Sequence, residues 1–154
     1  MKQQRRGRAI AMTPAEVDVF LAEERVCRLA SLDAGGAPDV APLWFVWDGR
    51  ALWINSLVRS QRWANVLRDP RVAVVIDAGV DYAELRGVEL HGKAEPVGDV
   101  PRSSEPDAVL DPVEAAFALK YRPDRGGFEP DGRHAWLRLV PAQITSWDFR
   151  KLPA

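Results

Sequence analysis

The chain has 154 residues, a formal net charge of −1 and a sequence pI near 6.1. This length fits one domain with a hydrophobic core of its own and argues against a second domain. The near-zero charge argues against a general nucleic-acid binder, which would carry a strongly basic face. No apolar run is long enough for a signal sequence or for the roughly 20 residues that span a bilayer, so we expect a cytoplasmic protein that does not contact membranes.

The first segment, residues 1–11, is basic, with cations at Lys2, Arg5, Arg6 and Arg8. Like-charged runs usually stay solvated and disordered, so we expect a flexible tail ahead of a single domain over residues 12–154. The alternative is an arm that contacts phosphate groups.

A short helix is predicted after this tail. Residues 13–16 form a capping box with proline at the first helical position, and the following turns have one apolar face, made by Val17, Phe20 and Leu21. Residues 25–32 then read as a strand, and residues 33–36 as a glycine-containing turn. We expect this strand to pair with the next one.

The next segment is rich in tryptophan. Residues 40–47 form an extended apolar run, Asp48-Gly49 is a hairpin turn signal, and residues 50–56 form the returning strand. These residues therefore predict one hairpin.

A second helix is predicted over residues 61–68, with Ser60 as its cap and Asp69-Pro70 as its end. A helix N-terminus presents unpaired N–H groups and a partial positive charge. Arg59, Gln61 and Arg62 could therefore hold an anion such as a phosphate there. The alternative is that Ser60 only caps the helix and the arginines are solvated surface charges.

Residues 72–77 and 85–95 read as two further strands. Residues 97–110 contain several prolines, serines and acids and predict a surface loop that could act as a lid. Residues 111–114 have the form of a second capping box, opening a helix that ends near Lys120-Tyr121. After a glycine- and proline-rich loop over residues 122–133, residues 134–140 and 143–149 read as two strands. Antiparallel strands with short helices favour a barrel.

Few other chemistries find support in the sequence. The single cysteine, Cys27, excludes an internal disulfide and is expected to be a buried apolar side chain. His91 and His134 are too far apart for the usual ligand spacing of a structural zinc site, so we expect no metal. The motifs of serine hydrolases, P-loop NTPases and Rossmann enzymes are absent.

Several motifs, in order, resemble the pyridoxamine 5′-phosphate oxidase-like split-barrel family, and in particular its actinobacterial branch of flavin or deazaflavin oxidoreductases. The resemblance covers most of the chain, and its motifs are residues 12–16, 20–24, 27–31, 42–47, 60–65, 69–73, 86–92 and 146–151. It implies a mainly β fold with short helices: a six- or seven-stranded antiparallel split β-barrel of the FMN-binding type. It also implies a homodimer with the cofactor at the subunit interface.

The resemblance implies roles for individual residues. Pro42, Leu43 and Trp44 match the strand along the cofactor's ring. The polyol and phosphate would lie against Asn55, Ser56, Arg59, Ser60, Gln61 and Arg62. Lys120 and Trp147 are further candidates for cofactor or substrate contact.

The phosphate motif departs from that of many relatives. Gln61 stands where they have arginine, which removes one charge, and Arg62 stands where they have lysine, which keeps a cation and favours bidentate phosphate contact. The six tryptophans are expected in cores or interfaces, with Trp44 and Trp147 as candidates for ligand contact.

The function that this resemblance implies is hydride transfer between a flavin-type cofactor, coenzyme F420 first and FMN second, and a small organic substrate. No catalytic residue is predicted, because the ring carries the chemistry and the protein orients and shields it. The alternative is a non-catalytic protein that binds flavin, deazaflavin or haem, for which His91 is a conceivable axial ligand.

Overall fold

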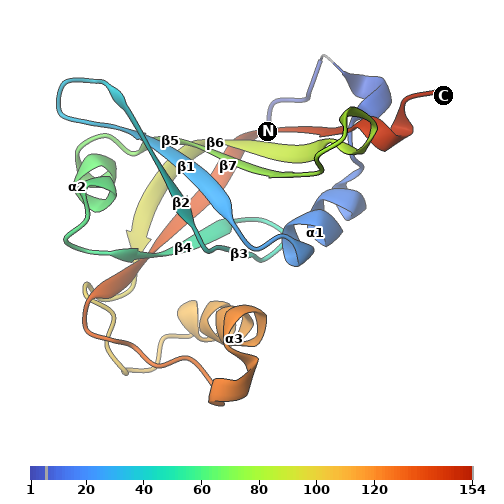
Figure 1. Cartoon of the computed structure of the whole chain (residues 1–154). Helices are drawn as coiled ribbons and strands as arrows, with labels where there is room; N and C mark the ends of the chain where they lie inside the picture. Colours follow the sequence, from blue (N-terminus) through green and yellow to red (C-terminus); the bar gives the residue numbers. More distant parts are fainter. Residues whose placement is uncertain (6, 154) are drawn as a thin grey trace.

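The computed structural model describes residues 1–5 and 7–153, and these build one seven-stranded antiparallel sheet. The sheet curls around a core, as Figure 1 shows, and its strand order is β2-β1-β5-β6-β7-β4-β3. The predicted fold class, a mainly β split barrel, is confirmed. The strands are β1 (Cys27–Leu32), β2 (Pro38–Leu43), β3 (Val46–Trp47), β4 (Leu52–Leu57), β5 (Arg71–Ala78), β6 (Arg86–Val97) and β7 (His134–Asp148).

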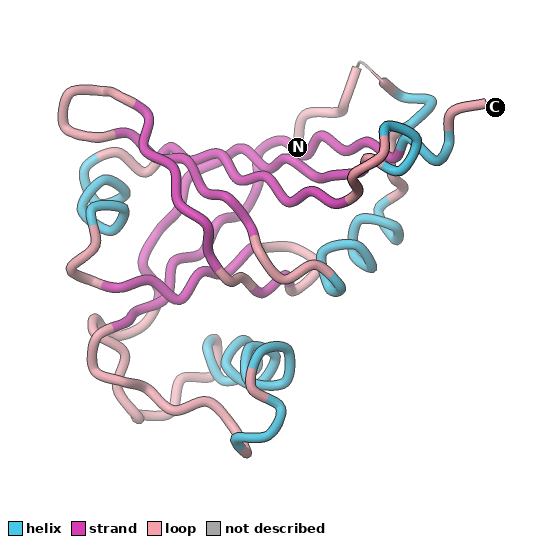
Figure 2. Tube along the Cα trace, in the orientation of Figure 1, coloured by secondary structure: helices cyan, strands magenta, loops and turns pink. Residues whose placement is uncertain are grey.

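Three α-helices lie around the sheet in the described part of the chain: α1 (Pro14–Glu23), α2 (Gln61–Arg68) and α3 (Leu110–Tyr121). Figures 1 and 2 show α1 and α2 close to the curled sheet and α3 set below it, next to long loops. Short 3₁₀ turns occupy Arg8–Ile10, Tyr82–Glu84, Pro123–Arg125 and Phe149–Lys151.

The first two helix starts follow the prediction. The Thr13 side chain accepts a hydrogen bond from the Glu16 N–H at 3.2 Å, and the Thr13 N–H donates to the Glu16 carboxylate at 2.7 Å, which completes the capping box. At α2, the Ser60 hydroxyl accepts from the Trp63 N–H at 3.1 Å. Both starts are local in sequence, which is why they could be predicted.

The predicted capping box at the start of α3 is wrong. The helix begins at Leu110, and Asp107 accepts hydrogen bonds from the N–H groups of Val109 and Leu110 at 2.9 and 3.1 Å. The Asp111 carboxylate accepts the N–H of Asp107 instead, at 3.2 Å. An aspartate four residues earlier thus takes the role predicted for Asp111.

Two predicted strand boundaries also need correction. Residues 134–140 and 143–149 are one long strand, β7, which passes a β-bulge at Ala142, since His91 pairs with Gln143 and Gly92 with Pro141. Residues 40–47 are two strands, β2 and β3, which separate at Trp44 and pair with different neighbours. The first of these pairs with β1, as predicted.

The sheet separates two hydrophobic clusters. Alternate residues of β4 and β7 face opposite sides, so Leu52 and Ile54 belong to the cluster inside the curl, which α1 and α2 also line. Trp53 and Trp136 belong to the second cluster, outside the curl, where α3 packs. Asn55 follows the outward alternation and therefore faces the α3 side. This outer layer holds the cavity described below.

Burial agrees with several predictions. Cys27 is fully buried, and burial raises the pKa of its thiol to about 12. Three tryptophans lie in the cores: Trp53, Trp63 and Trp136.

The N-terminal segment contacts the sheet. The Lys2 N–H donates to the Ala142 carbonyl at 3.0 Å, and the Gln4 side chain bonds both the N–H and the carbonyl of Ser146. Arg6 lies outside the described residues. The predicted flexibility of residues 1–11 concerns motion and stays a prediction beside these contacts. Among the described residues, no helix combines the length and apolar character needed to cross a bilayer.

Candidate functional site

A cavity of about 520 Å³ opens between the outer face of the sheet, α3 and the loop after it. Three predicted ring-contact residues, Pro42, Leu43 and Trp44, line it at the end of β2, and Asn55 lines it from β4. The other side is formed by Phe117 and residues of the 122–131 loop. A volume of this size fits a cofactor or a drug-sized molecule.

An aromatic stack stands at the edge of the cavity, where Trp44 lines it. Trp44 lies parallel to Tyr121, with ring centroids 4.4 Å apart and an interplanar angle of 9°. The Arg25 guanidinium lies 5.0 Å from the Tyr121 ring centroid. Trp44 remains 42% exposed, so an indole face backed by a second ring is available for a planar ligand.

The Tyr121 hydroxyl explains why the chain breaks between β2 and β3. It accepts from the Phe45 N–H at 3.0 Å and lies 2.9 and 2.8 Å from the carbonyls of Phe45 and Arg25. A side chain from α3 thus satisfies the backbone groups that leave the sheet. Burial raises the pKa of Tyr121 to about 12, so its hydroxyl keeps its proton for these bonds.

Asn55 contributes an unsatisfied donor to the cavity. Its side-chain Nδ2 is buried and has no hydrogen-bond partner among the described residues. A buried polar group without a partner costs roughly 1–3 kcal/mol, and such groups usually bind a water, an ion or a ligand. An acceptor atom on a bound molecule would satisfy it.

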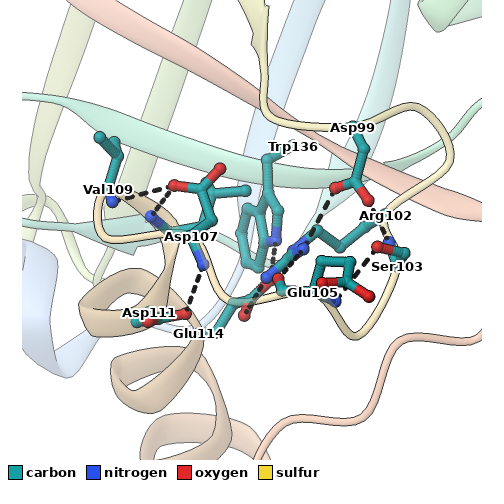
Figure 3. Close-up of polar contacts among 10 residues, drawn as sticks. Asp99, Arg102, Ser103, Glu105, Asp107, Val109, Asp111, Glu114 and Trp136 are labelled. Atoms are coloured by element: carbon teal, nitrogen blue, oxygen red, sulfur yellow. Dashed lines mark hydrogen bonds and ion pairs between the residues drawn. The ribbon is translucent and has the colours of Figure 1, made fainter.

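A buried ion pair holds the loop between β6 and α3, as Figure 3 shows. Arg102 is only 4% exposed and donates to both carboxylate oxygens of Glu114, at 2.6 and 3.2 Å. Its other bonds go to Asp99 and to the Glu105 carbonyl, and Trp136 Nε1 donates to Glu114 at 3.1 Å. These contacts raise the pKa of Arg102, chiefly through the hydrogen bonds to Glu114.

This network fixes the loop over residues 97–110, which the sequence predicts as a lid. The Arg102 N–H also donates to the His134 carbonyl at 2.8 Å, so the middle of the loop is bound to both α3 and β7. Arg102 lines the cavity. Closure of this loop as a lid would require breaking a buried bidentate pair.

The predicted phosphate residues gather at the start of α2, on the other side of β4. The Arg62 Nε donates to the Ser56 hydroxyl at 3.2 Å, and burial lowers the pKa of this half-buried guanidinium. The Gln61 amide donates to Asn65 at 2.8 Å. Asn55 and Ser56 are adjacent residues with opposite facings, so Asn55 faces the cavity and Ser56 faces this helix start.

This chain was compared with known protein families, curated sequences and solved structures. The family model described as pyridoxamine 5′-phosphate oxidase matches residues 13–148. The chain belongs to this family. No curated protein sequence matches it.

Solved structures of several relatives share the fold. The conserved hypothetical protein Rv2991 from Mycobacterium tuberculosis is 30% identical with a TM-score of 0.79, over 99% of this chain and 95% of that one. A protein titled F420 reductase is 25% identical with a TM-score of 0.59, over 82% and 94%. The haem storage protein HutZ from Vibrio cholerae is 17% identical with a TM-score of 0.68, over 87% and 95%, and shows likeness of fold alone.

Two residues that the family resemblance singles out, Lys120 and Trp147, lie apart from both groups, whereas Arg59 directly precedes the cap of α2. Lys120 points to α1 and β3, where its Nζ donates to the Leu21 carbonyl at 3.0 Å and lies 4.0 Å from the Phe45 ring centroid. Burial, with the nearby Arg25 charge, lowers the pKa of Lys120 to about 8. Arg59 is exposed in the turn before α2.

Trp147 lies on another part of the sheet. It pairs with Gly87 near the far end of β7, on the order of 40 Å of extended chain from His134. Its indole covers Gly87 so closely that a Cβ there would come within 2.4 Å of the ring. Within one chain, Trp147 therefore packs against β6.

Sequence reasoning missed the charged residues of the cavity wall. Arg102 lies in the predicted loop over residues 97–110. Asp131 lies in the predicted loop over residues 122–133, and His134 directly follows that loop. The only signal was the spacing Asp131-Gly132-Arg133-His134, in which an aspartate precedes a histidine by three residues across a glycine turn.

Proposed function

We propose that this protein binds a flavin-type cofactor, coenzyme F420 first and FMN second, and transfers hydride between it and a small organic substrate. Family membership supports a cofactor of this class, and the protein titled F420 reductase supports the preference for F420. The observation that carries the proposal is the cavity between Trp44 and Asn55, with an exposed indole face and an unpartnered buried donor.

The residues present fit such a cofactor. Pro42, Leu43 and Trp44 would hold the ring, and Asn55 Nδ2 would donate to one of its acceptor atoms. Among the described residues, Arg62 is hydrogen-bonded through Nε alone, so its two terminal nitrogens can donate to a phosphate at the start of α2. The remaining contacts would come from Ser56, Arg59, Ser60 and Gln61.

When bound, the ring would supply hydride chemistry, and the protein's part would be to orient it and exclude water. Trp44 and Tyr121 provide a fixed platform, since the Tyr121 hydroxyl is hydrogen-bonded to the backbone of Phe45, between β2 and β3, and of Arg25, ahead of β1. Arg102 and Glu114 hold the loop that borders the cavity.

A homodimer belongs to the proposal. The surface around the ring-contact strand exposes apolar side chains, with Val40 at 67% and Leu57 at 36%. Covering such a surface with a second copy would be favourable. It would also offer a place in the site for the partner's Trp147, which one chain alone keeps at a distance. Light scattering during gel filtration tests this point directly.

The deciding experiment is a side-by-side titration of the purified protein with F420, FMN and haem, followed by fluorescence quenching or absorbance. Micromolar binding of F420 supports the first choice, and a preference for FMN supports the second. Turnover of the bound, reduced cofactor by organic acceptors separates an enzyme from the alternative, a binding or storage protein. Binding of neither F420 nor FMN would end the proposal, and binding of haem alone would replace it.

A further inference from the structure

An aspartate–histidine pair lies in the cavity wall where the 122–133 loop enters β7. Asp131 Oδ2 lies 2.6 Å from His134 Nδ1, and both residues line the cavity. The histidine side chain is 27% exposed, so it is neither buried in the core nor fully solvated.

The carboxylate is held firmly behind the imidazole. Asp131 Oδ1 accepts the N–H groups of Arg133 and His134 at 2.9 and 3.0 Å. Gly132 has a φ of 71°, the left-handed conformation that allows this turn. Burial acts to raise the pKa of Asp131, but the hydrogen bonds from Arg133 and His134 outweigh it, and the net pKa is lowered.

An ionised Asp131 determines the state of the ring. A carboxylate only accepts, so Nδ1 must carry a proton toward it. Nε2 is then the atom whose proton comes and goes, and it has no hydrogen-bond partner among the described residues. This arrangement, a histidine oriented by a carboxylate, is one that general acids and bases use.

Asn55 and His134 lie on the same face of the sheet. In the β4–β7 ladder Asn55 pairs with Trp136, and Leu57 pairs with His134. Residues two apart in a strand share a face, so Asn55 and His134 are diagonal neighbours, roughly 7–8 Å apart. Asn55 Nδ2 is the donor proposed above for the cofactor ring, so a ring bonded to it would lie beside His134.

We propose that His134 is the proton donor of this cavity and that Asp131 positions it. This rests on the proposed function, because the reductant is the reduced flavin-type cofactor. With a conjugated carbonyl as the acceptor, the carbonyl π bond breaks as the conjugated system accepts a hydride and the oxygen accepts the Nε2 proton. Substrate gains two electrons, the cofactor loses them, and the imidazolium becomes neutral imidazole.

Other charges face the cavity and act on the same proton. They are Arg102, which is already paired with Glu114, and the loop residues Arg122, Arg125 and Glu129. A change of pH alone would not separate their effects from that of His134. The test therefore uses variants of the pair itself.

The chain has two histidines, so His91→Gln leaves His134 as the only imidazole. His91 bonds Glu89 on an exposed stretch of β6 and serves as the control position. In this background, ¹⁵N NMR of the neutral imidazole is expected to show the Nδ1–H form, and Asp131→Ala is expected to lose this preference because the carboxylate that accepts the Nδ1 proton is gone. An Nε2–H form in the parent, or an unchanged tautomer in Asp131→Ala, overturns the role of Asp131.

The second measurement concerns turnover, with F420 or FMN as the cofactor and menadione and 2-cyclohexenone as acceptors. We expect His134→Gln to bind cofactor within about threefold of the wild type and to lose about 100-fold or more in kcat. His91→Gln should keep wild-type kcat. Full activity of His134→Gln with bound cofactor overturns the inference and leaves the proposed function standing.

Two remaining outcomes are also decisive. If cofactor binds and neither acceptor turns over, the His134 ¹⁵N signal is still expected to shift on saturation with cofactor, and an unchanged signal would place His134 outside the site. If neither cofactor binds to the wild type, the proposed function fails, and the role of His134 as proton donor fails with it.

Discussion

The two ends of the proposed site are built in different ways. At the start of α2, Ser60, Gln61 and Arg62 are consecutive, and their partner Ser56 is only six residues from Arg62. At the α3 cavity, Arg102, Glu114 and His134 come from separate segments and meet only through the fold. The first region is set by local sequence and the second by packing, so the second depends more strongly on buried polar contacts.

The largest expected effect tests this dependence. Arg102→Ala leaves Glu114 buried without its charge partner, and we expect a loss of about 3–5 kcal/mol in the free energy of unfolding. Urea denaturation measures it. The matched control is Arg28→Ala, whose ion pair with Asp77 has both side chains about half exposed, with an expected loss under about 1 kcal/mol. Equal losses in the two variants would show that the buried network does not support the α3 layer.

The second effect concerns the α2 end. Arg62→Ala should weaken binding of F420 or FMN by about 1.5–3 kcal/mol, because a charge-assisted contact to phosphate is lost. Cofactor titration measures it, with Arg50→Ala, in the β3–β4 turn, as a control of equal charge change. Unchanged affinity in Arg62→Ala would remove this residue from the site and leave the cavity end untouched.

The same contrast explains what the sequence could predict. Residues 61–68 form a helix with the predicted bounds because a serine cap and a following Asp-Pro are local signals. The aspartate that caps α3 could not be chosen from sequence, since Asp107 and Asp111 both precede helical residues and only packing decides between them.

Strand continuity shows the same limit. The sequence pattern predicts two strands, residues 134–140 and 143–149, with Pro141 and Ala142 between them. In the fold Pro141 lies beside the bulge at Ala142, where β7 changes register against β6 and continues. The family motifs indicated four residues of the cavity, Pro42–Trp44 and Asn55. The pairs Arg102–Glu114 and Asp131–His134 could be found only in the tertiary structure.

A smaller effect is expected at Tyr121 of α3, whose hydroxyl bonds the backbone between β2 and β3. Tyr121→Phe keeps the ring that stacks on Trp44 but removes the hydroxyl bonded to the Phe45 N–H. We expect a loss of about 1–3 kcal/mol in the free energy of unfolding, because buried backbone groups lose their partner. Tyr82→Phe is the control, since Tyr82 is 72% exposed, and should change stability by less than about 0.5 kcal/mol. If the two variants match in urea denaturation, the hydroxyl bonds at Phe45 contribute nothing measurable.

The smallest effect is a pH dependence from Lys120. Its pKa is lowered to about 8 in the folded chain, chiefly by burial, against an ordinary value of 10.5. Between these values the unfolded chain binds the proton more than the folded chain does, so this group makes stability rise as pH rises through 8. Lys120 is half-buried and partly screened, so we expect a rise of no more than about 1 kcal/mol between pH 8 and 9.

Lys120→Met should lack this rise, whereas Lys93→Met, on an exposed position of β6, should keep it. The Cys27 thiol, whose pKa is raised to about 12, lowers stability as pH approaches 9 because the unfolded thiol ionises first, and it does so equally in wild type and Lys120→Met, so the difference between the two slopes isolates Lys120. Identical slopes in wild type and Lys120→Met would mean that this ammonium is better solvated than its contacts with Leu21 and Phe45 indicate.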